Sequence, residues 1–327
     1  MEDKCISKNK LKGYQSMSLS KKIRLSEEII KDFYHNIPNN ENVYISSSFG
    51  KDSIVLIDLV RKEYPNLPII YCNTGVELKG SEELSKKYDN VITLKPIKPM
   101  EKVIEENGYM LPLGKAKTNI LRLARNNLAN SKFDTYAVKK ISGTPPFDKK
   151  SLWNYSKYAY CLAAPFKISE ECCKFLKIKP LKKFCKEHNF KYSYVGTTAE
   201  ESRLRTDSIQ RFGFNKEFQS RPLGHWTEQD ILKYIKTHSL ELADCYGEIK
   251  EQDGKLYTSK FNRNGCFCCP VGCHLKNPNQ FQLLEKYYPN DWEYAVKVLG
   301  YGKVFDFLKI PYSISTEKQQ TLTKIMR

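Results

Sequence analysis

Short apolar segments alternate with amphipathic segments through the first hundred residues, and this alternation most constrains the fold. The apolar segments are rich in β-branched and aromatic residues and end in turn residues, as buried strands do. Strands that alternate with helices at this spacing favour a parallel sheet of the doubly wound α/β class. The expected strands are 42–49, 67–75, 90–94 and, later, 190–196, and the expected helices are 18–37, 52–60 and 81–87.

The remainder of the chain predicts additions to this α/β core. Residues 100–170 show helices and polar loops without a clear strand, which indicates an insertion. A helix is expected to begin at Thr227, because Asp230 follows at capping-box-like spacing. We therefore expect three parts, which are an N-terminal helical segment (1–40), a nucleotide-binding α/β domain (41–250) and a cysteine-bearing module with helices (251–327).

Composition excludes several classes of protein. Of 327 residues, 40% are hydrophobic and 28% charged, which excludes disordered and collagen-like chains. No stretch reaches the length of a membrane span, and the N-terminal residues lack the apolar core of a secretory signal, so a cytoplasmic protein without a membrane partner is expected. The net charge is +17, with cations scattered along the chain. This surplus indicates either a lysine-rich solvated surface or a polyanionic partner.

A serine-rich loop follows the first expected strand. It runs from Ser46 to Ser53 with the sequence SSSFGKDS. Small hydroxyl side chains and Gly50 let backbone amides approach an anion, the helix N-terminus behind them supplies a positive dipole, and Lys51 can neutralise charge. The Walker pattern is absent. The alternative is a serine-rich turn with no ligand.

Seven of the 11 cysteines fall in two regions, 161–173 and 266–273. The pair Cys266 and Cys269 has the spacing of two thiolates that bind one metal centre from a tight turn, and Cys172 and Cys173 could supply two further ligands. Tetrahedral zinc is an alternative, and so is the absence of any metal. Cys268 and Cys273 are additional thiols nearby in sequence. The isolated Cys5, Cys72, Cys185 and Cys245 are expected to be small buried hydrophobes.

Six ordered segments together resemble the phosphoadenosine phosphosulfate (PAPS) reductase family of the adenine-nucleotide α-hydrolase-like (ATP pyrophosphatase) superfamily. SSSFGKDS is similar to the pyrophosphate loop of that superfamily, and NTG at 73–75 resembles its turn near the nucleoside. VGTTAEESRLR at 195–205 and HWTEQDIL at 225–232 resemble two further family segments. The double cysteine at 172–173 and RNGCFCCPVG at 263–272 match cysteine segments of bacterial and phage members.

The resemblance implies a site that binds an adenine nucleotide, ATP or PAPS, with Mg²⁺ held by Asp52. Arg203 and Arg205 would clamp a distal anion, although both could instead pair with Glu200, Glu201 or Asp207 on a helix surface. Arg221 and His225 are weaker candidates. The implied catalytic residues are Lys51, Asp52 and Arg203. The implied nucleotide-binding residues are Ser46, Ser48, Phe49, Gly50, Lys51, Asp52, Ser53, Asn73, Thr74, Gly75, Gly196, Arg203 and Arg205.

A [4Fe-4S] cluster on Cys172, Cys173, Cys266 and Cys269 is the cofactor that the resemblance implies, with zinc as the alternative. The sequence departs from the family in two ways, because TLTKIMR at 321–327 holds no nucleophilic cysteine and the phosphate loop ends in Asp52-Ser53. An aspartate there fits Mg²⁺-assisted handling of a triphosphate.

Three functions are therefore kept open. The first is a PAPS-reductase-family enzyme of sulfur metabolism or sulfur transfer. The second is an ATP pyrophosphatase-type enzyme that adenylates DNA or tRNA for thiolation, with a sulfur-donor protein and a nucleic acid as partners. The third is a non-catalytic metal-knuckle protein that binds nucleic acid.

Overall fold

The computed structural model describes residues 5–38 and 42–314, and the tail at 321–327 lies outside the described residues. The chain divides into two compact units. One is drawn from Met1–Pro96 and Lys177–Gly265, and the other from Ile97–Leu176 and Cys266–Arg327. This division groups the segment between 97 and 176 with the C-terminal part of the chain. The domain bounds predicted at residues 40 and 250 stay a prediction, because the division into two units does not test them.

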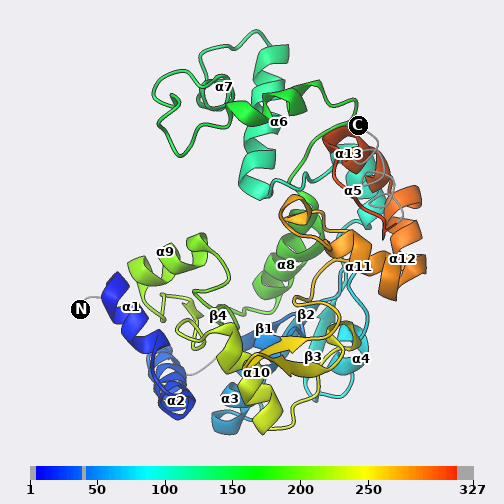
Figure 1. The fold of residues 1–327 in the computed structure, drawn as a ribbon. Coiled ribbons are helices and arrows are strands. Elements are labelled where there is room, and N and C mark those ends of the chain that lie inside the picture. The colour runs from blue at the N-terminus through cyan, green and yellow to red at the C-terminus, as the bar shows by residue number, and fades with distance from the viewer. Residues whose placement is uncertain (1–4, 39–41, 315–327) are drawn as a thin grey trace. The chain divides into compact units, whose positions relative to one another are not determined.

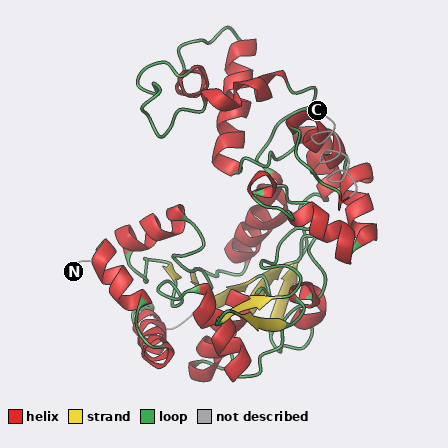
Figure 2. Ribbon diagram, in the orientation of Figure 1, coloured by secondary structure: helices red, strands yellow, loops and turns green. Residues whose placement is uncertain are grey.

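A five-stranded parallel sheet forms the centre of the first unit (Figures 1 and 2). Its strand order is β3-β2-β1-β4-β5, and Ile45 of β1 pairs with Ile69 of β2 on one side and Tyr194 of β4 on the other. The strand order therefore reverses between β1 and β4, which is where α/β sheets bind ligands. The strands are β1 (Val43–Ser47), β2 (Ile69–Cys72), β3 (Val91–Leu94), β4 (Tyr192–Val195) and β5 (Gln219–Ser220).

Helices flank the sheet and confirm the predicted α/β class. Helix α3 packs against β1 and β4, and α8 packs against β2, so the central strand is almost entirely buried. The predicted capping box is confirmed at α10, where Thr227 and Asp230 cap each other. The helices of this unit are α1 (Lys8–Gln15), α2 (Leu19–His35), α3 (Lys51–Glu63), α4 (Ser81–Ser85), α8 (Lys179–Glu187), α9 (Arg203–Phe212), α10 (Glu228–Thr237) and the short 3-10 helix η4 (Asp244–Tyr246).

Several elements of this unit were not predicted, and α8 and β5 are among them. A two-stranded antiparallel hairpin, β6 (Ile249–Gln252) and β7 (Lys255–Thr258), also lies outside the expected strands. Helix α1 was also missed, because its only buried residue is Leu11 and it therefore shows little apolar periodicity.

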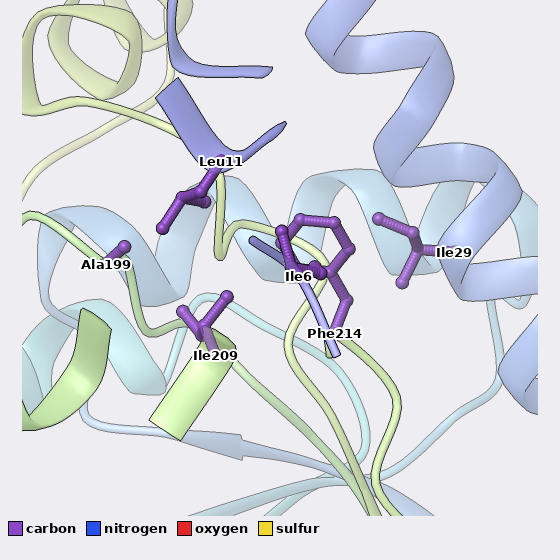
Figure 3. Packing of buried hydrophobic residues seen from close by; sticks show 6 residues of the cluster. All are labelled: Ile6, Leu11, Ile29, Ala199, Ile209 and Phe214. Atoms are coloured by element: carbon purple, nitrogen blue, oxygen red, sulfur yellow. The ribbon is translucent and has the colours of Figure 1, made fainter. Parts of the chain in front are cut away.

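The N-terminal segment packs onto helix α9 (Figure 3). Ile6 and Leu11 lie in one cluster with Ile209 and Phe214 from α9 and the loop after it. The Ile6 amide also donates to the Gln210 carbonyl over 2.8 Å. Because α9 begins with Arg203 and Arg205, this cluster fixes the helix that carries both candidate arginines.

The second unit is helical, as predicted for residues 100–170, and within its described part only an isolated bridge between Tyr109 and Ile168 has β character. No helix of the described chain is long and apolar enough to cross a membrane. The elements of the second unit are α5 (Met100–Asn107), α6 (Lys115–Ala129), α7 (Tyr136–Ser142), the 3-10 helices η2 (Ser156–Ala163) and η5 (Cys273–Leu275), α11 (Gln280–Tyr287), α12 (Pro289–Glu293), the π-helix η6 (Tyr294–Val298) and α13 (Tyr301–Leu308). A second π-helix, η3 (Lys174–Ile178), spans the boundary with the first unit.

Candidate functional site

The serine-rich loop connects β1 to α3 at the reversal of strand order. Phe49 adopts a left-handed backbone conformation with φ 51°, and its ring is fully buried against Tyr71 and Tyr88. A bulky residue in this region of φ costs about 1–3 kcal/mol, so the surrounding packing must enforce it. The Phe49 side chain thus anchors the loop in the interior, and only its backbone faces the turn.

Hydroxyl and amide groups converge where the loop enters the helix. The Ser48 and Ser53 hydroxyl oxygens lie 3.4 Å apart, and the Ser48 amide donates to the same Ser53 oxygen. The amides of Asp52 and Ser53 lie in the first turn of α3, where helix geometry provides no internal acceptor. Ser46 is partly exposed on β1. This part of the site can present donors to an anion.

Two residues that the sequence did not indicate brace the loop. The Tyr246 hydroxyl accepts hydrogen bonds from the Lys51 amide (3.0 Å) and the Asn264 amide (3.1 Å). The Asn264 side-chain amide donates to the Ser48 carbonyl (2.8 Å) and to the Ser81 hydroxyl. A Cβ atom on Gly50 would lie 3.0 Å from the Tyr246 hydroxyl, so a glycine suits the close approach of this ring.

Lys51 is buried and already paired. Its ammonium lies 2.9 Å from a Glu228 carboxylate oxygen and donates to the Asn262 carbonyl. Burial raises the pKa of Asp52 to about 6, Lys51 opposes that shift, and the Glu201 and Glu228 carboxylates add to it. One cation and three carboxylates therefore interact at the start of α3.

The end of β4 closes against the start of α3. A Cβ atom on Gly196 would lie 2.9 Å from the Asp52 carbonyl oxygen and 3.1 Å from the Ser53 Cα. The next residue, Thr197, has a buried hydroxyl without a hydrogen-bond partner among the described residues. The structure thus brings the predicted Gly196 to the serine-rich loop, and it adds Thr197, which sequence reasoning missed.

The turn at Asn73–Gly75 lies at the carboxyl end of β2, the strand beside β1. The Asn73 side-chain oxygen accepts from the Gly75 amide over 2.9 Å, and its side-chain amide donates to Glu82. Thr74 is buried, and Gly75 has φ 73°. The turn is closed by its own asparagine, so its place at this edge is set before any ligand arrives.

The candidate arginines begin helix α9. Arg203 is 83% exposed and lies 3.9 Å from Asp207, and Arg205 lies 3.9 Å from Glu201. These contacts are at the limit of an ion pair and are worth little at an exposed position. Both arginines thus pair with nearby acidic residues, as the alternative interpretation expected. The pairing is weak enough for either side chain to exchange its partner for a ligand.

Two weaker candidates lie in the interior of the first unit. Arg221 is buried and donates to the Ser208 hydroxyl (2.9 Å) and the Gly213 carbonyl. His225 is fully buried, with Nε2 3.2 Å from the Lys22 carbonyl, and burial lowers its pKa to about 4. These contacts give both side chains a structural role.

The second unit brings the four predicted cysteine ligands into mutual electrostatic interaction. A hydrogen bond with Cys173 raises the pKa of the Cys172 thiol, as do burial and the neighbouring Cys173, Cys269 and Cys266. Burial raises the pKa of Cys269 to about 12, with further contributions from Cys266 and Cys173. The Cys269 amide donates to the Cys266 carbonyl over 3.0 Å, which makes the tight turn expected of this spacing.

The other cysteines fall into different environments. Cys268 is fully buried and Cys273 nearly so, and Cys273 accepts backbone hydrogen bonds at the start of α11. Of the isolated cysteines, Cys245 is buried as predicted. The prediction is wrong for Cys5, which is exposed and donates to the Arg211 carbonyl, and Cys72 and Cys185 are only partly buried.

A buried hydroxyl interacts electrostatically with the cysteine group. Tyr301 opens helix α13, is fully buried, and its hydroxyl has no hydrogen-bond partner among the described residues. Burial raises its pKa, and the thiols of Cys268, Cys172, Cys269 and Cys266 raise it further. A buried, unpartnered donor within electrostatic range of these thiols suits a sulfur-rich centre, whose sulfurs accept hydrogen bonds.

The thiols do not stand in a finished coordination geometry. Across residues 5–38 and 42–314, no group of three or more His, Cys, Asp or Glu side chains is placed so that it could hold a metal ion. The donor chemistry and the orphaned Tyr301 hydroxyl fit a thiolate-bound centre, and the thiols would have to close around it.

Comparison with known proteins places this arrangement in a family. The model for the "Phosphoadenosine phosphosulfate reductase domain" matches residues 42–118 and 146–272. An uncharacterised protein of Methanocaldococcus jannaschii is 24% identical over 310 residues, which cover 91% of this chain and 56% of that protein. The chain thus spans about half the length of this relative.

Adenosine 5'-phosphosulfate reductase of Halalkalibacterium halodurans is 23% identical over 246 residues, which cover 73% of this chain and 83% of that protein. The crystal structure of PAPS reductase from Candida auris in its phosphate complex is 14% identical, covers 76% of this chain and 98% of that chain, and superposes with a TM-score of 0.40. The family match spans the phosphate loop, the turn after β2, the end of β4 and both cysteine segments. The chain therefore belongs to the phosphoadenosine phosphosulfate reductase domain family.

Proposed function

We propose that this protein binds an adenine nucleotide as its Mg²⁺ complex at the β1–α3 loop and uses it in sulfur transfer. The observation that carries the proposal is the set of side chains at the start of α3. Asp52 lies in the first helical turn behind hydroxyls and free amides, and it interacts with Glu201 and Glu228 around a single lysine. Such a site repels a bare polyphosphate and suits one that arrives with a divalent cation, because Mg²⁺ is commonly held by one carboxylate together with substrate phosphates.

The residues divide the task of binding as follows. The amides of Asp52 and Ser53 and the hydroxyls of Ser48 and Ser53 would contact phosphate oxygens, and Asp52 would hold Mg²⁺. Lys51 would reach the nucleotide when Glu228, which is half-exposed, turns toward solvent. Arg203 and Arg205 are available for a distal anion. Asn73–Gly75 and Gly196 shape the two sides of the loop at the reversal of strand order.

The preferred reaction is cleavage of ATP between its α- and β-phosphates. An acceptor oxygen attacks the α-phosphorus, the bond to the bridging oxygen breaks, and pyrophosphate leaves with Mg²⁺, which neutralises its charge. A sulfur nucleophile then displaces AMP from the adenylated acceptor, and sulfur replaces that oxygen. A [4Fe-4S] centre on Cys172, Cys173, Cys266 and Cys269 would supply sulfur or electron-transfer chemistry, and zinc on the same thiols is the alternative.

Sulfonucleotide reduction is the second candidate, because relatives of this chain are named adenosine 5'-phosphosulfate reductases. One experiment separates the two reactions. Anaerobically purified protein is incubated either with MgATP and a nucleic-acid acceptor (tRNA or DNA) or with PAPS or APS and a thiol reductant, and pyrophosphate and sulfite are measured. The proposal expects pyrophosphate from ATP that Asp52→Ala abolishes. Sulfite from PAPS or APS without pyrophosphate from ATP overturns it in favour of reduction. Metal binding with neither product favours the non-catalytic alternative.

A further inference from the structure

The segment between α6 and η2 carries an unusual excess of positive charge. Residues 115–157 contain ten Lys or Arg and two Asp. The family model leaves 119–145 unmatched between its two stretches, so most of this segment is an addition to the shared fold. Helices α6 and α7 and the 3-10 helix η2 pack together within the second unit (Figure 1).

Large aromatic side chains stand exposed in the same segment. Phe133 is 65% exposed, Tyr136 60% and Trp153 57%. Soluble proteins seldom expose aromatic rings together unless the surface binds a partner. Because the rings lie among cations, the surface is suited to an anionic partner that also offers flat apolar faces.

A buried lysine holds these rings in place. The Lys140 ammonium lies 4.4 Å from the Tyr136 ring centre, 4.8 Å from that of Trp153 and 5.1 Å from that of Phe147. A cation–π contact in a desolvated position contributes about 2 kcal/mol, so the cage positions Tyr136 and Trp153 before a partner binds. Their exposed faces are therefore preorganised.

Exposed lysines adjoin the rings in the sequence. Lys149 and Lys150 precede Trp153, Lys132 precedes Phe133, and all three lysines are exposed. No described carboxylate pairs with any of them, whereas Lys139 pairs with Asp134. A polyphosphate backbone would find unpaired ammonium groups here.

We infer that this surface, defined by Lys132, Phe133, Tyr136, Lys149, Lys150 and Trp153, binds an unpaired nucleic-acid strand. Lysines contact the phosphates, and the rings stack on exposed bases, which is how single strands are bound without sequence readout. An unpaired strand offers a flat base beside every phosphate, whereas an acidic protein offers flat faces only at its aromatic residues. The inference rests on the proposed function for its purpose, since the bound strand would be the acceptor of the adenylate and then of sulfur.

The test measures fluorescence anisotropy of labelled 20-nucleotide single-stranded RNA and DNA and of the matching duplex with the full chain. The proposal expects tighter binding of at least one single strand than of the duplex. K149E/K150E should weaken binding about tenfold or more and reduce the dependence on salt concentration. W153A and F133A should each weaken it about five- to a hundredfold, since each removes a stacking face.

The matched control is K182E/K183E, which reverses the charge of two exposed lysines that are consecutive in the sequence on α8, in the first unit. It should change affinity less than twofold. Equal losses in both charge-reversal variants, equal binding of duplex and single strand, or full competition by polyglutamate would overturn the inference. Circular dichroism and melting temperature confirm that W153A and F133A are folded.

Pyrophosphate release from ATP, measured in the same preparations, separates this inference from the proposed function. A wild-type chain that cleaves ATP but binds no single strand refutes only the surface, and a wild-type chain that binds a single strand but does not cleave ATP refutes only the proposed reaction.

Discussion

Substitution of Gly196 by alanine tests whether the end of β4 sets the phosphate loop. The added methyl group would lie 2.9 Å from the Asp52 carbonyl oxygen, 3.1 Å from its carbonyl carbon and 3.1 Å from the Ser53 Cα. All three atoms belong to the backbone of α3, so no side chain can rotate away. Ordinary contact near 3.4 Å requires β4 and the start of α3 to separate by about half an ångström.

The energetic cost follows from two opposing effects. Overpacking of one methyl group against rigid backbone costs about 1–3 kcal/mol. Alanine also restricts the unfolded chain, which returns about 0.4–1 kcal/mol. The net destabilisation is therefore about 1–2 kcal/mol. The displacement falls on Asp52 and Ser53, whose amides are proposed to hold phosphate, so nucleotide affinity should fall about tenfold, the equivalent of about 1.4 kcal/mol.

Isothermal titration with MgATP and urea denaturation measure the two effects. Gly13→Ala is the matched control, because its methyl group enters open space on α1. It should raise stability by about 1 kcal/mol through helix propensity and leave nucleotide affinity unchanged. Wild-type affinity in Gly196→Ala would refute the idea that β4 positions the loop.

Three further predictions concern single side chains. With the Asp52 pKa near 6, MgATP should bind more weakly at pH 5.5 than at pH 7.5, because protonation of the carboxylate removes the Mg²⁺ ligand. Asp52→Asn should abolish this difference between titrations at the two pH values. The variant should lose no stability at pH 7.5, because burial already disfavours the charged carboxylate there. Tyr246→Phe leaves the buried amides of Lys51 and Asn264 without an acceptor and should cost about 2 kcal/mol or more in urea denaturation, and an unchanged midpoint would contradict the bracing role. Tyr301→Phe removes an unpartnered buried hydroxyl, so the metal-free protein should keep or gain stability. In protein that carries the iron–sulfur cluster, the same substitution should lower the reduction potential, because a hydrogen bond to sulfur is lost. A less stable metal-free protein together with an unchanged reduction potential would contradict a hydrogen bond from Tyr301 to the cluster.

Local patterns made the nucleotide half of the fold predictable. Strands β1, β2 and β3 are short apolar runs that end in turn residues, and each expected range contains the observed strand. Thr227 and Asp230 form their capping box within three residues of each other. Signals of this kind need no knowledge of distant parts of the chain.

Long-range contacts were not predictable from the same patterns. Tyr246 braces Lys51 from 195 positions away, and Asn264 reaches Ser48 from 216 positions away. A tyrosine or asparagine in a turn-rich segment carries no signal for such a role. Likewise, the pairing of Lys51 with Glu228 depends on where α10 begins relative to α3, which is a property of packing and not of spacing.

The charge of the chain acquires a different meaning once its location is known. The start of α3 has one buried lysine among three carboxylates, so the surplus positive charge of the chain, +17, does not lie at the proposed nucleotide site. A nucleotide that binds there must bring its own divalent cation. A local excess of cations lies instead in residues 115–157, beside exposed rings, and 119–145 of this segment lie outside the family match. Ten cations less two aspartates give this segment +8 of the net charge of +17, so a large share of the surplus lies in a helical segment beside exposed rings and not at the start of α3.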